Sequence, residues 1–265
     1  GPRAAQPGYD FLVQGMCGIM DLTGEPGGEP QKVGVAWIDI FTGLYGVIGI
    51  QAALAERERS GLGQRVDLSL LDVGVAVLAN QAMNYLVGGT VPSRLGNAHP
   101  NIVPYQAFAT ADGHMIVAVG NDEQFKRFCQ VIDQPQLAQD GRFATNGSRV
   151  QHREALVPIL ALALAVQPTD SWLAACEAVG VPCGPINTLD RVFDDPHVKA
   201  RGLKQTLPHA QAGEVNLVAN PIRINGQSLS AQSVPPTLGE HTDSVLDAIG
   251  ISDEQRAALR AAGII

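Results

Sequence analysis

A stretch rich in helix-breaking residues, from 88 to 104, divides the chain into two segments with different patterns. Three glycines and one proline precede His99-Pro100-Asn101 in this stretch. Glycine and proline interrupt helices and strands, so the stretch is predicted to be a linker or an active-site loop. Long apolar helical patterns dominate the residues before it, whereas a β-hairpin pattern opens the residues after it. We therefore expect a larger domain followed by a smaller one.

The segment before this stretch carries a lone carboxylate, Asp39, inside the apolar run 33–43. Residues 43–59 are predicted to form a helix, which places Asp39 just before a helix N-terminus. Such a position favours an ionised carboxylate through the helix dipole and the free backbone N–H groups. A partly desolvated carboxylate there can act as a nucleophile or a general base. Most aspartates before helices are simple N-caps, and position alone leaves both interpretations open.

Hydrophobic periodicity predicts the other elements on either side of the divide. In the first segment, Asp10 is a candidate cap for a helix reaching Met20, and a stripe of glycines at 43, 46 and 49 predicts tight packing of the long helix. The expected elements are a strand at 64–70, a helix at 72–86, a hairpin of 105–110 with 115–119, helices at 122–132, 149–165 and 169–179, an antiparallel pair within 203–218, and a helix at 252–262.

Composition excludes several classes of function. The 265 residues carry a net charge of −8, and the 18 basic residues are scattered, which argues against a nucleic-acid partner. The four cysteines lack metal-ligand spacing, so no metal site is expected, and reduced thiols in a cytoplasmic protein are the simplest account. No signal peptide and no apolar stretch of membrane-spanning length are expected, so no membrane partner is predicted.

Five motifs together resemble the family III CoA-transferases, the CaiB–BaiF family. No one of them is sufficient, but together they extend over nearly the whole chain. They are Pro7-Gly8-Tyr9-Asp10, the Asp39 run continuing into Gly61-Leu62-Gly63-Gln64-Arg65-Val66-Asp67, Gly96-Asn97-Ala98-His99-Pro100-Asn101-Ile102-Val103-Pro104-Tyr105-Gln106, Gly184-Pro185-Ile186-Asn187 with Asp195-Pro196-His197-Val198, and Pro236-Thr237-Leu238-Gly239-Glu240-His241-Thr242.

The resemblance implies an α/β fold with a Rossmann-like large domain, a small α/β domain and an interlocked homodimer. On this basis residues 1–95 are expected to be the C-terminal part of the CoA-binding large domain, 96–200 the small domain, and 201–265 a return segment ending in a helix. Family members normally have a substantial segment before the position of Gly1, and the chain starts without Met. We therefore expect the large domain to be incomplete here, with the front part on a separate chain or missing.

The resemblance also implies an activity. Asp39 matches the catalytic aspartate of the family, which carries acyl groups and CoA between an acyl-CoA and a free carboxylic acid through anhydride and thioester intermediates. CoA and acyl-CoA are expected as substrates, without a permanently bound cofactor, metal or ATP. The loop at 96–104 is expected to exclude water. Some members have a glycine-rich loop here, and His99-Pro100-Asn101 suggests small dicarboxylic acids instead.

Further site residues follow from the same resemblance, each with a plainer alternative. His99 and Asn101 are expected to bind the substrate carboxylate, although a loop histidine can simply pack against the neighbouring domain. Tyr105 and Gln106 are candidate donors to an oxyanion, or merely the start of the hairpin.

Tyr9 and Asp10 resemble a pair near the CoA site, and for Asp10 a helix cap is the alternative.

Two rival functions remain from the sequence. An α-methylacyl-CoA racemase shares this fold and needs two bases on opposite faces of the α-carbon. In that branch a histidine stands where this chain has Tyr9, so the second base is missing. Deuterium incorporation at the α-carbon of a branched acyl-CoA would support the racemase. The second rival is an inactive chain that retains only dimerisation surfaces.

Overall fold

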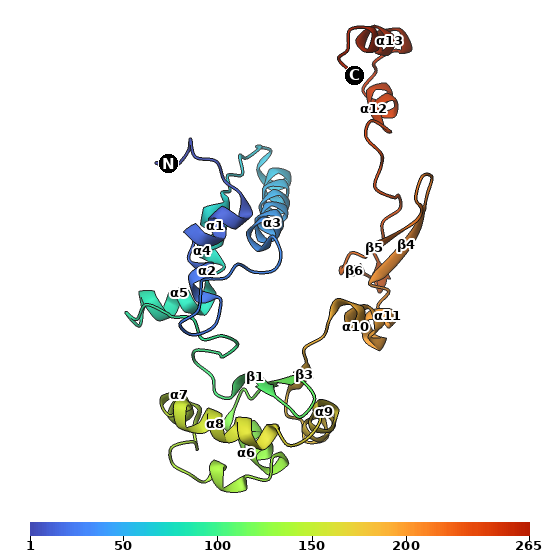
Figure 1. Cartoon of the computed structure of the whole chain (residues 1–265). Coiled ribbons are helices and arrows are strands. Elements are labelled where there is room, and N and C mark those ends of the chain that lie inside the picture. Colours follow the sequence, from blue (N-terminus) through green and yellow to red (C-terminus); the bar gives the residue numbers. More distant parts are fainter. The chain divides into compact units, whose positions relative to one another are not determined.

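The computed structural model describes all residues 1–265 and divides into two compact units, residues 1–186 and 187–265 (Figure 1). Each unit mixes helices with small antiparallel sheets. The domain boundaries predicted at 95/96 and 200/201 follow a different division and stay predictions.

The first 95 residues are helical and contain no strand. The helices are α1 (Asp10–Met16), α2 (Ile19–Leu22), α3 (Trp37–Ser60), α4 (Leu70–Ala76) and α5 (Ala79–Leu86). The prediction of one helix from Asp10 to Met20 is wrong, because Gly18 adopts a φ of +93° and separates α1 from α2. The single helix predicted at 72–86 is also wrong. It breaks at Ala79, whose φ of +47° lies in the left-handed region.

The strand predicted at 64–70 is wrong as well. Residues 62–69 are irregular and exposed, because no neighbouring strand is present to pair with their backbone groups. Their alternation nevertheless has a role, since two side chains face the glycine stripe of α3. A Cβ at Gly49 would lie 3.0 Å from Val66 Cγ1, and a Cβ at Gly46 would lie 3.7 Å from Leu68 Cδ1. The tight packing predicted for the stripe is confirmed at Gly49, whereas Gly46 is in ordinary contact and Gly43 faces open space.

Residues 103–185 form a small α/β fold around the main core of the chain. The predicted hairpin is confirmed, with Tyr105 opposite Ala118, and a third strand adds to its second strand antiparallel. Helices cover this sheet and bury phenylalanine, leucine and valine side chains completely. The elements are β1 (Tyr105–Ala109), β2 (His114–Ala118), α6 (Asp122–Val131), η1 (Pro135–Ala138), α7 (Asn146–Gln151), α8 (Arg153–Leu164), α9 (Thr169–Ala178) and β3 (Cys183–Pro185).

The second unit contains two short hairpins and four helices. The predicted antiparallel pair is confirmed, with Lys204 opposite Val218, and the terminal helix has a capping box between Ser252 and Gln255. The helix α12 was not predicted. The elements are α10 (Leu189–Asp194), α11 (Pro196–Ala200), β4 (Lys204–His209), β5 (Gly213–Val218), β6 (Arg223–Ile224), β7 (Gln227–Ser228), α12 (Thr242–Ala248) and α13 (Asp253–Ala261).

Helix α3 is apolar and largely exposed. The only fully buried side chain that it contributes is Ile38, which packs with Val13 and Cys17 in a small second core. By length and composition alone α3 is apolar enough to cross a membrane, with a mean hydropathy of 1.5. This corrects the expectation that no stretch of that length exists. One such helix is weak evidence for a span, because helices of soluble proteins meet the same criterion.

Candidate active site

The N-terminus of α3 is capped by a side chain from another helix. Ala36 occupies the N-cap position and has no side-chain acceptor. Instead the Asp10 Oδ1 atom accepts hydrogen bonds from the backbone N–H groups of Ile38, at 2.8 Å, and Asp39, at 3.3 Å. Asp10 thus caps a helix as predicted, but the helix is α3 and not the one that begins at Asp10. Asp10 is the first residue of α1 and makes no cap bond there.

A buried glutamine holds Asp10 and the chain entering α3 in place. The Gln14 side chain is completely buried, and its Nε2 donates to Asp10 Oδ2 at 2.7 Å. Its Oε1 accepts from the Val33 N–H at 2.9 Å, and its Nε2 also donates to the Val35 carbonyl at 3.4 Å. All polar atoms of this side chain are therefore used to join α1 to the residues just before α3. Sequence reasoning missed Gln14, although it lies one helical turn after Asp10.

Asp39 itself is the third residue of α3 and has an exposed side chain. This corrects two expectations, that it precedes the helix and that it is partly desolvated. The helix begins earlier than predicted because the Asp10 carboxylate supplies the cap that Ala36 lacks. No hydrogen bond within the chain reaches the Asp39 carboxylate, and no other element covers it. Its oxygens are consequently free to react with a ligand.

Removing the Asp10 carboxylate should loosen the start of α3. We expect Asp10→Ala to lower the free energy of unfolding by about 1 kcal/mol, the usual cost of losing a helix cap. Asp10→Asn should cost less, because asparagine also caps helices well. Urea denaturation followed by circular dichroism measures both. Equal stability of the alanine and wild-type proteins would show that the cap has no energetic role.

A second group of predicted residues meets at the start of β1. His99 donates its backbone N–H to the Tyr105 carbonyl at 2.9 Å, and the two rings contact with centroids 5.3 Å apart. The His99 Nδ1 atom accepts a hydrogen bond from the Asn101 N–H at 3.1 Å. An accepting Nδ1 places the proton of the neutral ring on Nε2. His99 is thus set up to donate a hydrogen bond through Nε2.

The environment of the His99 ring favours its neutral form. Partial burial, and then the positive charge of Arg153, lower the pKa of His99 below its ordinary value. The folded chain therefore binds this proton more weakly than the unfolded chain. Any stability that depends on neutral His99 is present above the ordinary histidine pKa of about 6.5 and falls as the pH drops below it.

Arg153→Gln should raise the pKa of His99 toward the ordinary histidine value, because one positive neighbour is lost. A nuclear magnetic resonance titration of the His99 ring protons measures this change. Arg142→Gln, which alters an arginine paired with Asp140, serves as the control and should leave the titration unchanged. A His99 pKa that stays the same or falls in Arg153→Gln would contradict the assignment.

Asn101 pairs with α5 through its side-chain amide. Asn101 and Asn84 exchange two amide hydrogen bonds, each of 3.3 Å, and the Asn84 Nδ2 also donates to Gln81 at 2.9 Å. Beside this pair lies an open cavity of about 700 Å³, bordered by α5, residues 87–95 and Pro100. The position of Asn101 at this cavity is compatible with binding a ligand, and its predicted role stays a prediction.

The remaining predicted residues are placed as follows. Tyr105 is the first residue of β1 and is 40 % exposed, and Gln106 is half-buried beside it. Tyr9 is 76 % exposed at the N-cap of α1 and makes no side-chain bond there. The structure joins Asp10 with Asp39 and joins His99 with Asn101 and Tyr105. No hydrogen bond or ring contact connects the two groups.

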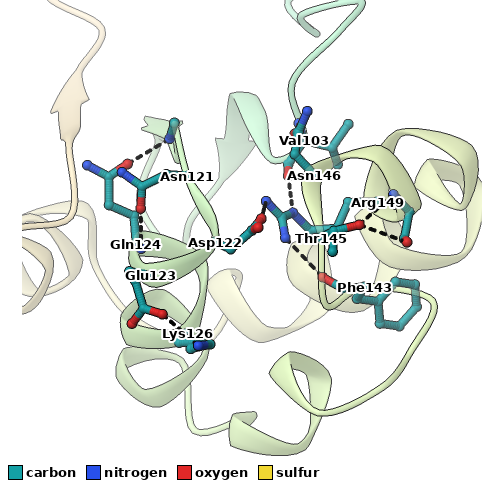
Figure 2. A network of polar contacts seen from close by, with 12 residues as sticks. Val103, Asn121, Asp122, Glu123, Gln124, Lys126, Phe143, Thr145, Asn146 and Arg149 are labelled. Carbon is teal, nitrogen blue, oxygen red and sulfur yellow. Dashed lines mark hydrogen bonds and ion pairs between the residues drawn. The ribbon is translucent and has the colours of Figure 1, made fainter.

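Sequence reasoning missed the residues that hold the 99–103 backbone. Figure 2 shows Arg149 directing its guanidinium toward Val103, Phe143 and Asp122, with Asn146 beside it. A completely buried arginine was not anticipated. The signal available was the spacing of Asn146, Arg149 and Arg153, three and four residues apart, which puts polar side chains on one helix face. No cluster of three or more histidine, cysteine or acidic side chains with metal-binding geometry is present in the chain.

Comparisons with known proteins agree with these features. A family model described as CoA-transferase family III matches residues 1–242. The "Succinate--glutarate CoA-transferase" of Agrobacterium fabrum is 49 % identical over 246 residues, which are 93 % of this chain and 62 % of that protein. The "Succinyl-CoA:glutarate CoA-transferase" of Mus musculus is 39 % identical over 254 residues, covering 96 % and 58 % of the two chains.

A crystal structure of a CAIB/BAIF family protein from Brucella suis has a TM-score of 0.77 at 49 % identity. It covers 94 % of this chain and 65 % of its own. The chain thus spans about three fifths of the length of the curated relatives it matches. The family model extends over more than nine tenths of the residues. The chain belongs to CoA-transferase family III.

Proposed function

We propose that this chain carries the acyl-accepting part of a site that transfers CoA between an acyl-CoA thioester and a free carboxylic acid. The observation that carries this proposal is the state of Asp39. Its carboxylate is exposed and has no hydrogen bond, while Asp10 occupies the adjacent N–H groups of α3. An aspartate kept for helix capping would use those N–H groups itself.

The proposed chemistry needs only this carboxylate and the two substrates. An Asp39 oxygen attacks the thioester carbonyl and the C–S bond breaks. CoA leaves as the thiolate, and Asp39 and the acyl group are joined as a mixed anhydride. The thiolate attacks the aspartyl carbonyl, the anhydride C–O bond breaks, and the first acid departs from an aspartyl-CoA thioester. The acceptor acid then repeats both steps in reverse. Each thiolate and carboxylate released is used again or leaves as product, so no proton is gained or lost overall.

The 99–106 segment is proposed to bind the second carboxylate of a small dicarboxylic acid. His99 supports this role because its neutral ring offers the Nε2 proton to an acceptor. Asn101, Tyr105 and Gln106 lie in the same segment, and Asn101 borders the cavity of about 700 Å³. The names of the curated relatives, which refer to succinate and glutarate, support dicarboxylates as the substrate class.

Tyr9 is proposed to contact CoA, because its exposed ring lies next to the Asp10 cap of α3. An exposed aromatic ring can stack on the adenine of a nucleotide-containing ligand. Asp10 is proposed to act through Asp39, by fixing the first turn of α3, rather than by touching CoA itself.

The exposed face of α3 is proposed to be covered in a homodimer. Ile40, Leu44, Val47, Ile48 and Ile50 are each at least half exposed. Exposed apolar side chains gathered on one element can mark an association surface. We also propose that the two chains of this dimer interlock and that the large domain is Rossmann-like.

A cytoplasmic setting is proposed from the thiols. All four cysteines are free, and three of them are buried. Burial raises the pKa of both Cys129 and Cys176 to about 12, so these thiols are unreactive near neutral pH. Unreactive thiols are compatible with a reducing compartment, and the proposed reaction uses no cysteine.

Trapping the covalent intermediate tests the proposal. The protein is incubated with succinyl-CoA, quenched with hydroxylamine, and digested for peptide mass spectrometry. An aspartyl thioester should be converted to a hydroxamate at Asp39 only. Asp72 provides an internal control, because it is also an exposed aspartate at the third position of a helix. Exchange of CoA without modification of Asp39 would overturn the proposal.

A further inference from the structure

Three side chains on one face of α7 and α8 bind the backbone of the loop at 99–103. Asn146 Nδ2 donates to the Asn101 carbonyl at 2.8 Å, and Asn146 Oδ1 accepts from the Val103 N–H at 3.1 Å. Arg149 Nε donates to the Val103 carbonyl at 2.6 Å. Arg153 donates to the carbonyls of His99, at 3.2 Å, and Pro100, at 2.7 Å.

Arg149 is the most rigidly held of these three residues. Its side chain is completely buried, and it also donates to the Phe143 carbonyl at 3.0 Å and to Asp122 at 2.9 Å. Its guanidinium lies 4.4 Å from the centre of the Phe125 ring. Figure 2 shows the hydrogen bonds to Val103, Phe143 and Asp122 converging on this guanidinium. A buried cation with every one of these partners in place has little freedom to move.

The hydrogen bonds use loop backbone atoms and leave two loop side chains unclamped. None of the three residues bonds to the His99 ring or to the Asn101 amide. The His99 ring is therefore positioned by these residues only through the backbone that carries it, whereas the Asn101 amide is also held by its two hydrogen bonds to Asn84 of α5. Four backbone carbonyls and one backbone N–H of the loop from 99 to 103 are bound by these side chains.

We infer that Asn146, Arg149 and Arg153 form a backbone clamp that sets the shape of the 99–103 loop and thereby the length of acid that the site prefers. They are positioning residues, since none is placed against the substrate. The selectivity part of this inference rests on the proposed function, because it assumes that the loop faces the acid. The mechanical part, that the clamp holds the loop, stands on the structure alone.

Amide hydrogen exchange tests the mechanical part independently of activity. In Asn146→Ala the Val103 N–H loses its acceptor, so its exchange should accelerate about tenfold, as expected for one lost hydrogen bond. Asn146→Asp keeps an acceptor for that N–H and should give a smaller increase. Gln151→Ala changes an exposed residue of the same helix that has no bond to the loop, and should have no effect. Unchanged exchange at Val103 in Asn146→Ala overturns the clamp.

Acceptor competition tests the selectivity part. With succinyl-CoA as donor, the ratio of kcat/KM for glutarate and malonate should change about fivefold or more in Asn146→Ala, since differences of a methylene group are worth about that factor or more. The change should lie in KM for the acid, and Gln151→Ala should keep the wild-type ratio. Faster exchange with an unchanged ratio overturns selectivity by the clamp. A wild-type protein without transfer activity overturns the proposed function instead, and the exchange result still decides the mechanical part.

Discussion

Asp39→Asn should reduce CoA transfer by about three orders of magnitude or more, the scale expected when a covalent nucleophile is removed. Asparagine has nearly the same shape, but its amide oxygen is too weak a nucleophile to form the anhydride. The fold should remain, because Asp39 makes no side-chain hydrogen bond and Asp10 supplies the helix cap. Initial rates with succinyl-CoA and a dicarboxylic acid measure the loss.

The matched control is Asp72→Asn. Asp39 and Asp72 are both exposed, and both are the third residue of a helix, so they contribute similarly to their helix dipoles. If Asp39 only stabilised a helix end, the two substitutions would have equally small effects. Asp72→Asn should keep transfer near the wild-type rate. Near-wild-type turnover by Asp39→Asn would refute a covalent role.

Arg149→Met should lower the free energy of unfolding of the fold formed by residues 103–185 by about 3 kcal/mol, the scale of leaving two buried carbonyl oxygens without a donor. Methionine fills much of the volume but leaves the Val103 and Phe143 carbonyls without their donor. Buried unpaired acceptors are costly. Urea unfolding followed by the fluorescence of Trp172 measures the change. Trp172 is buried in the same core, and a Trp37→Phe background removes the other tryptophan.

Arg142→Met is the matched control for burial. Arg142 also pairs with an aspartate, Asp140, and also lies over a phenylalanine ring, at 4.8 Å from the Phe143 centre. Its side chain is 57 % exposed, whereas that of Arg149 is fully buried. Ion pairs in water contribute little to stability. The urea midpoint should therefore barely move. Equal shifts in the two variants would show that burial does not determine the contribution of this arginine.

Local patterns predicted the small domain well. The hairpin around Asp112-Gly113 and the helices α6 and α9 follow from alternation and periodicity that agree with their tertiary environment. The single helix predicted at 149–165 is wrong, because α7 ends at Gln151 and α8 begins at Arg153, with His152 between them. The large-domain strand at 64–70 failed for a tertiary reason, because an alternating segment becomes a strand only where a neighbour pairs with it. The break at Ala79 has no local signal, since alanine favours a continuous helix.

The sequence was sufficient to predict which residues belong to the candidate site, but not how they are arranged. The residues of the matching motifs were found, and Asp39 lies at a helix N-terminus as expected in outline. The cap across two helices was not predictable, because it joins Asp10 to Ile38 over 28 positions. The polar face formed by Asn146, Arg149 and Arg153 had a readable spacing. Its function depended on where the 99–103 backbone lies, which spacing alone does not give.

The two cores of the first unit differ greatly in size, and Asp39 lies on the side with the smaller one. The buried side chains of Val13, Cys17 and Ile38 supply little cohesion, whereas residues 103–185 have a full core of their own. In the proposed homodimer the partner chain stabilises the α3 segment by mass action, so the folded fraction of this segment decreases when the protein is diluted. On dilution, transfer activity should therefore disappear before the small domain loses its structure. Enzyme concentration would then act on the reaction through the integrity of α3 itself.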